Sequence, residues 1–148
     1  MPAIAMTPYQ DSLTYAGTFA GKAMKACLAL SNGSLTDAST VAQWDAQKLS
    51  GNGYSDFIWT LPAGSFNATT GRFEAPSQLA TFAASAGGAG LTWNALYLVA
   101  GTINGGTTTW ETTAPRGILL LGSSFVLPAG KSYGYTINLF ADGFTVTS

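Results

Sequence analysis

The chain has 148 residues, with 6 basic and 7 acidic side chains, a single cysteine and no histidine. A chain of this length forms one domain and buries a core without disulfide staples. The residue counts exclude an internal disulfide framework and every catalytic triad that needs histidine. They also leave the usual zinc, iron and copper sites without ligands, so we expect no metal and no cofactor.

The low charge content is the most informative bulk property. Only 9% of the residues are charged, against about 25% in a typical soluble domain. A free monomer of this size exposes on the order of 7,000 Å². The composition therefore predicts that neighbouring subunits cover much of the surface, with an unusually neutral monomer as the alternative.

The basic residues are scattered and form no stripe that could neutralise phosphates, so we expect no nucleic-acid partner. The first residues contain neither a basic segment nor a long apolar segment, so we expect no signal peptide. No apolar run approaches the ~20 residues that span a membrane. We expect a protein made in a cytoplasm and without a membrane partner.

The first part of the chain predicts an extended arm, residues 1–22, with one short helix over residues 11–19. A strand follows over residues 23–31, and Asn32-Gly33 after it is a common hairpin turn. The segment 41–49 fits a short helix and an extended strand equally well.

The middle of the chain alternates between strand and turn signals. We expect a strand over residues 56–61 and a hairpin whose turn is residues 67–71. In residues 78–85 the alternation places Ala80, Phe82 and Ala84 on one face.

The last third contains the most apolar strands. Residues 91–100 read as a buried strand, followed by a loop or a hairpin tip at Asn104-Gly105-Gly106. We expect a central strand over residues 117–122, a long strand over 133–140 and an edge strand over 144–147. Together these elements predict an all-β fold: an antiparallel β-sandwich or jelly-roll-like single domain over residues 23–148.

Few residues point to catalysis. Cys27 lies in an apolar run and is expected to be a small buried side chain, because free cysteines are usually buried. The glycines lack the spacing of phosphate-binding loops. Two of the acidic residues could meet as a glycosidase pair, which leaves a glycan-degrading hydrolase as a remote alternative.

The aromatic residues allow two interpretations. The tryptophans and tyrosines could line a sugar-binding surface, as in adhesins, or anchor the core and the subunit contacts. We expect Trp93, inside a strand pattern, to be a core residue. Trp110 lies in a polar, threonine-rich stretch and is expected to be exposed or to contact another subunit.

Three segments together resemble small structural proteins of tailed bacteriophages. They are Lys25-Ala26-Cys27-Leu28-Ala29-Leu30, the strand Leu91-Thr92-Trp93-Asn94-Ala95-Leu96-Tyr97-Leu98-Val99, and the run from Gly117-Ile118-Leu119-Leu120-Leu121-Gly122 through Leu127-Pro128-Ala129-Gly130-Lys131-Ser132-Tyr133. The segment Leu49-Ser50-Gly51-Asn52-Gly53-Tyr54 is similar to a turn in such proteins of cyanobacterial viruses.

The resemblance implies a non-enzymatic virion protein. Its members are capsid decoration (cement) proteins or tail-fibre-like proteins, and both possibilities carry over. The first implies a protein on the capsid surface whose partners are the major capsid protein and other copies of itself, as a homo-oligomer and by analogy a trimer. The second implies a tail or fibre component that contacts the host surface. The candidate protein-contact residues are Met1, Pro2 and Ile4 in the arm, together with Tyr54 and Trp110.

Overall fold

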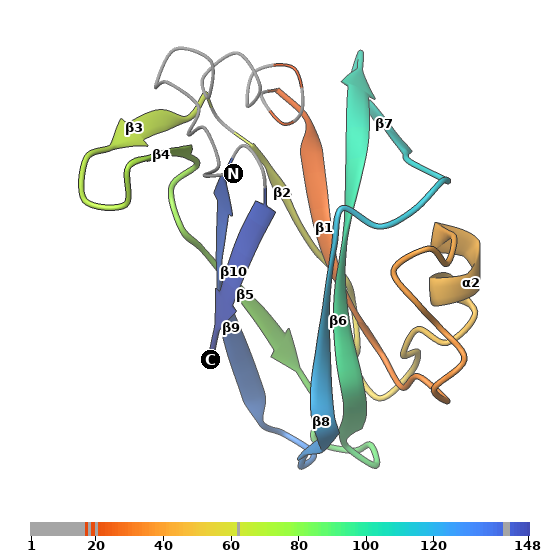
Figure 1. Cartoon of the computed structure of the whole chain (residues 1–148). Coiled ribbons are helices and arrows are strands. Elements are labelled where there is room, and N and C mark those ends of the chain that lie inside the picture. Colours follow the sequence, from red (N-terminus) through yellow and green to blue (C-terminus); the bar gives the residue numbers. More distant parts are fainter. Residues whose placement is uncertain (1–16, 18, 20, 62, 141–142) are drawn as a thin grey trace, which may run out of the picture.

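Two antiparallel sheets pack face to face (Figure 1). The computed structural model describes residues 17, 19, 21–61, 63–140 and 143–148. The first sheet contains β1 (Ala23–Ala29), β2 (Phe57–Thr60), β6 (Leu91–Asn104), β7 (Thr107–Trp110) and β8 (Gly117–Leu127). The second sheet contains β3 (Ser65–Asn67), β4 (Arg72–Glu74), β5 (Gln78–Ala83), β9 (Ser132–Phe140) and β10 (Gly143–Thr147). This arrangement confirms the predicted all-β sandwich of a single domain. The helix expected over residues 11–19 lies outside the described residues, apart from Gly17 and Phe19.

Alternating side chains from both sheets fill the space between them. The alternation predicted in β5 is confirmed, because Ala80, Phe82 and the following Ala84 share the buried face. Trp93 of β6 is fully buried, as expected, and its Nε1 donates a hydrogen bond of 2.9 Å to the hydroxyl of Tyr135 on β9. The sandwich is therefore joined at its centre by a hydrogen bond as well as by apolar packing.

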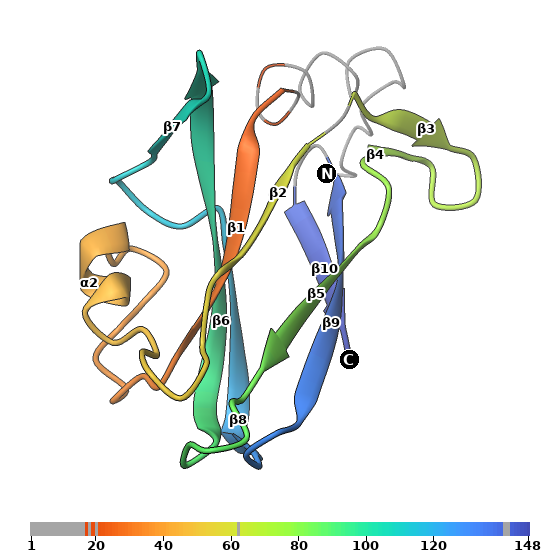
Figure 2. The same cartoon turned by 180° about the vertical axis from the view of Figure 1, so that it is seen from behind.

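The outer face of the first sheet is also apolar, and a segment of the chain covers it (Figure 2). The chain leaves β1 and returns at β2, and on the way it forms the short helix α2 (Val41–Asp45). Thr40 caps this helix in a capping box with Gln43. Val41 and Trp44 are buried against a cluster that includes Cys27 and Tyr97. The first half of the ambiguous segment 41–49 is therefore a helix, while Lys48 in its second half forms a β-bridge with Ala29. Cys27 is buried as predicted.

The hairpin predicted at Asn32-Gly33 is wrong. The next strand, β2, does pair antiparallel with β1, but it begins only at Phe57, so Asn32-Gly33 is not a tight turn between paired strands. Gly33 has φ 87°, which a loop can use as well as a hairpin can. The physical reason lies on the outer face of β1, where Cys27 and Ala29 need an apolar cover and the excursion with α2 supplies it.

The central strand predicted over residues 117–122 is also different in the structure. It is part of one longer strand, β8, which pairs with β6 and lies at the side of the sheet. The pairing shifts register between Trp93 and Ala95, which lets the strand continue through Gly122 to Leu127. Its apolar sequence is not a sign of a central position, since Leu120 points to solvent and is 62% exposed.

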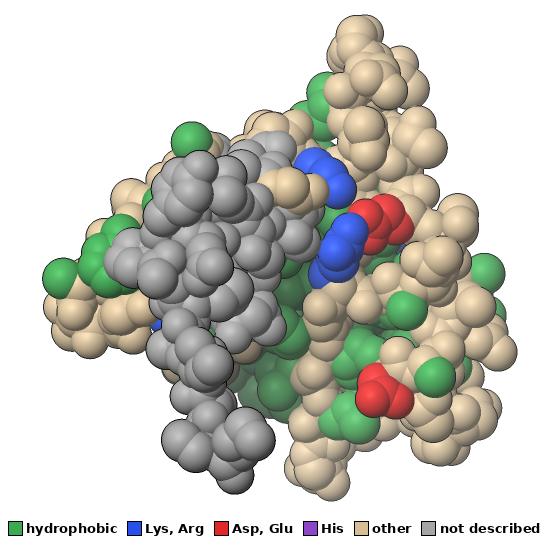
Figure 3. All heavy atoms as spheres, turned by 45° about the horizontal axis from the view of Figure 1, so that its top comes forward, with side chains coloured by type: hydrophobic (Ala, Val, Ile, Leu, Met, Phe, Trp, Pro, Cys, Tyr) green, Lys and Arg blue, Asp and Glu red, His purple; other side chains and the backbone are tan. Residues whose placement is uncertain are grey.

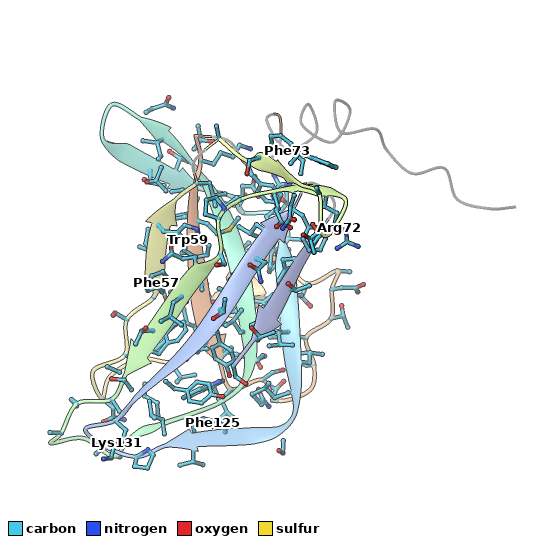
Figure 4. The ribbon with its side chains drawn as sticks, turned by 90° about the vertical axis from the view of Figure 1, so that its left-hand side faces the viewer. Phe57, Trp59, Arg72, Phe73, Phe125 and Lys131 are labelled. Carbon is cyan, nitrogen blue, oxygen red and sulfur yellow. The ribbon has the colours of Figure 1, made fainter. Side chains whose placement is uncertain are left out.

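Two hairpins extend from the same end of the sandwich. The expected turn at residues 67–71 joins β3 and β4, and the tip at Gly105-Gly106 joins β6 and β7. β6 therefore runs four residues past Ala100 and pairs with β7 there. Figure 4 shows Arg72 and Phe73 on the β3–β4 hairpin, at the opposite end of the sandwich from Lys131.

The seam between β8 and β10 depends on one glycine. A Cβ atom at Gly117 would lie 2.0 Å from a ring carbon of Phe144, so the ring packs directly on the glycine backbone. We predict that Gly117→Ala lowers the free energy of unfolding by about 1–3 kcal/mol, because the ring must move out of the seam. Urea denaturation measures this difference.

Gly122→Ala is the matched control in the same strand, since a Cβ atom at Gly122 would have no neighbour within 4 Å and the φ of this residue is not positive. This variant should change the unfolding free energy by less than about 0.5 kcal/mol. Equal losses in the two variants would show that the seam is not the cause.

Candidate interaction surfaces

Most charged side chains are engaged inside the chain. Glu111 accepts a bidentate hydrogen bond from Arg116 and lies 3.9 Å from the Lys22 ammonium. Lys48 pairs with Asp56 at 2.9 Å. The remaining charged residues with partners are Lys25 over the Trp110 ring, Arg72 over the Phe140 ring, Asp45 with Tyr97, and Glu74 with Asn67. Within the described ranges, only Asp37 and Lys131 have a charged side chain without such a partner.

Ion pairs thus compensate five of these charges, while Lys25, Arg72, Asp45 and Glu74 keep their charge beside uncharged partners. Figure 3 shows the end of the molecule from which the β6–β7 hairpin projects. Few charged side chains are visible there, and the basic ones lie against an acidic one. The rest of the described surface in this view consists of uncharged polar groups and scattered hydrophobic side chains.

Large aliphatic side chains point to solvent on several strands. Ile58, Leu79, Leu120 and Val126 are between 57% and 64% exposed. Smaller exposed fractions occur at Leu30, Phe66 and Ile103. Single exposed apolar residues are ordinary in soluble proteins. Here they are combined with a surface that has almost no free charge, which leaves little to oppose close contact with another protein.

Along the β9–β10 pairing the outer face of the second sheet carries uncharged polar side chains, while Arg72 and Glu74 lie at its β3–β4 end. Thr145 lies opposite Asn138, and Thr147 lies opposite Thr136. On the other side of β9, Thr136 faces Leu79. Such a face can approach a partner without desolvating an ion, which is the costly part of burying a polar surface.

A polar cluster holds the covering segment onto β1. The Leu28 backbone N–H donates to the Tyr54 hydroxyl at 2.8 Å, and this hydroxyl donates to Asp56 at 2.7 Å. Burial opposes ionisation of Asp56, but the hydrogen bonds from Lys48 and Tyr54 and the charge of Lys48 outweigh it, so the pKa of Asp56 lies below its ordinary value. Burial, followed by the charge of Asp56, raises the pKa of Cys27, which keeps the thiol protonated.

Tyr54 makes its contacts within the domain. Its ring stacks on Phe82 with centroids 6.2 Å apart, and its hydroxyl both accepts and donates a hydrogen bond. Burial is the main cause that raises the pKa of this hydroxyl, so it stays protonated and remains the donor to Asp56. As a candidate protein contact, Tyr54 therefore has no unused polar group.

Trp110 is half-buried at the end of β7. The Lys25 ammonium lies 4.8 Å from the centroid of its ring, and Gly101 packs against the ring. The ring thus covers a lysine that is only 8% exposed. The alternation of residues in β6 and β7 could have indicated that Trp110 lies against the sheet, but the threonine-rich sequence around it suggested a loop. Met1, Pro2 and Ile4 lie outside the described residues.

Three comparisons with known proteins found no relative of this chain. No protein-family model, no curated protein and no solved structure matches this chain. Within the described ranges no three His, Cys, Asp or Glu side chains gather as a metal site would require. The helices of that part of the chain are too short or too polar to cross a membrane.

The Asp56 cluster predicts a specific dependence of stability on pH. A carboxyl whose pKa is lower in the folded state stabilises the fold above its unfolded pKa, near 3.8, and loses this effect as the pH falls through the folded pKa. We expect Asp56→Asn to cost about 1–3 kcal/mol at neutral pH, because the bonds to an ionised acceptor are lost. Below pH 4 the wild-type and variant stabilities should converge, as measured by urea denaturation at each pH.

The control is Asp37→Asn, which removes an exposed carboxylate that has no partner in the described part of the chain. At neutral pH its unfolding free energy should stay within about 0.5 kcal/mol of the wild type. A constant difference between wild type and Asp56→Asn from pH 7 to pH 2 would contradict the assignment.

Proposed function

We propose that this chain is a non-enzymatic virion structural protein, a decoration or cement protein that binds the outside of a phage head. The observation behind the proposal is the composition of the surface. The chain has few charged residues, and several of them form ion pairs with each other, while large aliphatic side chains stay exposed on the edge strands. The sequence resemblance to phage structural proteins is the reason for proposing a capsid as the binding partner.

This surface suits a shell position for an energetic reason. A standard specific contact covers ~800 Å² on each partner. Desolvating an unpaired charge within such an area would cost several kcal/mol, and this surface offers few of them. Many copies that bind one shell at once can each use a modest affinity.

The partners we propose are the major capsid protein and further copies of this chain. The two hairpins, β3–β4 and β6–β7, project from one end of the sandwich and are suited to reach a neighbouring subunit (Figure 1). A trimer remains the expected symmetry by analogy. A tail or fibre position is the second candidate, since the same exposed side chains could contact a fibre partner or the host surface.

The first experiment measures copy number. Quantitative mass spectrometry of purified virions, with heads separated from tails, should find this chain with the heads, in numbers comparable to the major capsid protein. A few copies that travel with the tails would favour the fibre role. Absence from both fractions would overturn the virion proposal.

A second experiment maps the contact face. Each of Ile58, Leu79, Leu120 and Val126 is replaced in turn by glutamate, and binding of the purified variants to undecorated heads is measured by co-sedimentation. At a contact position the buried unpaired charge should weaken binding at least about tenfold. These residues are exposed, so the thermal stability should change little.

Lys131→Glu is the control, because it places the same charge on an exposed side chain that is already polar. It should bind as the wild type does if apolar contacts carry the affinity. If none of the four aliphatic substitutions weakens binding, the exposed aliphatic side chains do not form the contact.

A further inference from the structure

Two adjoining hollows lie at the base of the β3–β4 hairpin. Their volumes are about 620 Å³ and 300 Å³, and they share a wall formed by Asn67, Glu74 and Asn138. The larger hollow is also lined by Ser65, Phe66 and Ser77, among others. Figure 4 shows this end of the sandwich, with Arg72 and Phe73 labelled on the hairpin.

The hairpin holds the carboxylate of Glu74 in one orientation. Asn67 Nδ2 donates to one carboxylate oxygen, and the Thr70 hydroxyl lies 3.3 Å from the other, with the Asn67 carbonyl as a second acceptor for its single hydrogen at 3.4 Å. Asn67 is itself held, because its Oδ1 accepts the backbone N–H of Thr69 at 2.9 Å. A carboxylate has about four acceptor positions, and the described donors occupy two of them. Glu74 therefore faces a ligand as a preorganised acceptor.

Asn138 and the serines supply unused donors and acceptors. The Asn138 Nδ2 atom makes one long contact, 3.5 Å, to Thr145 Oγ1, and its Oδ1 has no donor among the described residues. The hydroxyls of Ser65 and Ser77 likewise have no hydrogen-bond partner in that part of the chain. The wall thus presents an amide, a carboxylate and two hydroxyls, and each hydroxyl can both donate and accept.

Apolar surface stands beside these polar groups. Phe66 lines the larger hollow, and its side chain is 45% exposed. In the smaller hollow the Arg72 guanidinium lies over the Phe140 ring, 4.2 Å from its centroid, and has no carboxylate partner in the described ranges. Binding sites commonly combine such an exposed ring with a few fixed polar groups that orient the ligand.

The charge balance narrows the class of ligand. Glu74 lines both hollows and Arg72 lines the smaller one, so the two opposite charges favour a ligand without net charge, and a single carboxylate falls short of a calcium site. A purely apolar ligand would leave the amide and the carboxylate unpaired. From these groups we infer that the hollow binds a neutral oligosaccharide, whose hydroxyls pair with Glu74, Asn138 and the serines while a sugar face covers Phe66. This goes beyond the proposed head-binding role and does not depend on it.

The test is a titration of the isotope-labelled full chain with maltotriose and with the trimer of N-acetylglucosamine, followed by NMR. The expected result is a set of saturable shifts confined to the amides of residues 65–68 and 74–77 and to the Asn138 side chain. Asn138→Ala and Phe66→Ala should each weaken binding about three- to tenfold, which corresponds to the loss of one ordinary hydrogen bond or ring contact.

Asn104→Ala is the matched control, because Asn104 is an exposed asparagine on the other hairpin. It should bind the sugars with unchanged affinity, and the thermal melting of all variants should show that they fold. The inference is overturned if neither trisaccharide shifts these signals at about 10 mM, a concentration at which even millimolar affinity is detected, or if Asn138→Ala and Phe66→Ala both bind as the wild type does. Shifts produced by inorganic phosphate in place of the sugars would also overturn it. None of these outcomes bears on head binding, which is measured without sugar.

Discussion

The two sheets are joined at their centre by Trp93. Its ring is fully buried, packs against Phe125 and Tyr133, and donates a hydrogen bond to Tyr135 across the sandwich. Leaving a buried indole N–H without an acceptor costs about 1–3 kcal/mol, so the bond to Tyr135 stabilises the way β6 and β9 face each other.

The same strand, β6, organises the opposite face of its sheet. Tyr97 points outward, donates to Asp45 at 2.6 Å and packs against Trp44 of α2 with ring centroids 5.3 Å apart. The segment between β1 and β2 is therefore fastened twice, at α2 and at the Lys48–Asp56–Tyr54 cluster. In both places a charged residue is used to hold the chain to itself, which is why so few charges remain on the surface.

A neutral surface explains the proposed role better than any single residue does. With 6 basic and 7 acidic side chains, the chain carries far fewer charges than a domain of this size normally uses to remain isolated in solution. The aliphatic residues on β2, β5 and β8 lie at the sides of the sandwich, where a neighbour can cover them. The hollow beside Glu74 differs from these aliphatic surfaces. Its polar side chains are held by hydrogen bonds within the chain and can still form hydrogen bonds with a ligand.

Much of the fold could be predicted from local patterns. Alternation in residues 78–85 and the apolar run of residues 91–100 reflect which side of a strand is buried, and this is a property of the sequence alone. The turn at residues 67–71 was predictable from its local sequence too, because the Asn67 side chain accepts hydrogen bonds from the backbone of the turn itself. The interior positions of Cys27 and Trp93 also followed from their apolar neighbours.

The order of the strands and the composition of the surface were decided only by the tertiary structure. Asn32-Gly33 has the chemistry of a tight hairpin turn, but the apolar outer face of β1 required a cover, and the chain passes through α2 before it pairs with β1 as β2. β8 is as apolar as a central strand, yet it lies at the side of the sheet, because only its pairing with β6 determines its position. Trp110 and Tyr54 looked available for contacts, and long-range partners, Lys25 and Leu28, use them internally. By itself the sequence determined an all-β chain with little charge. Some contacts of its few charges, such as Lys22 with Glu111 and Asp45 with Tyr97, required residues distant in sequence to meet, which local patterns do not encode.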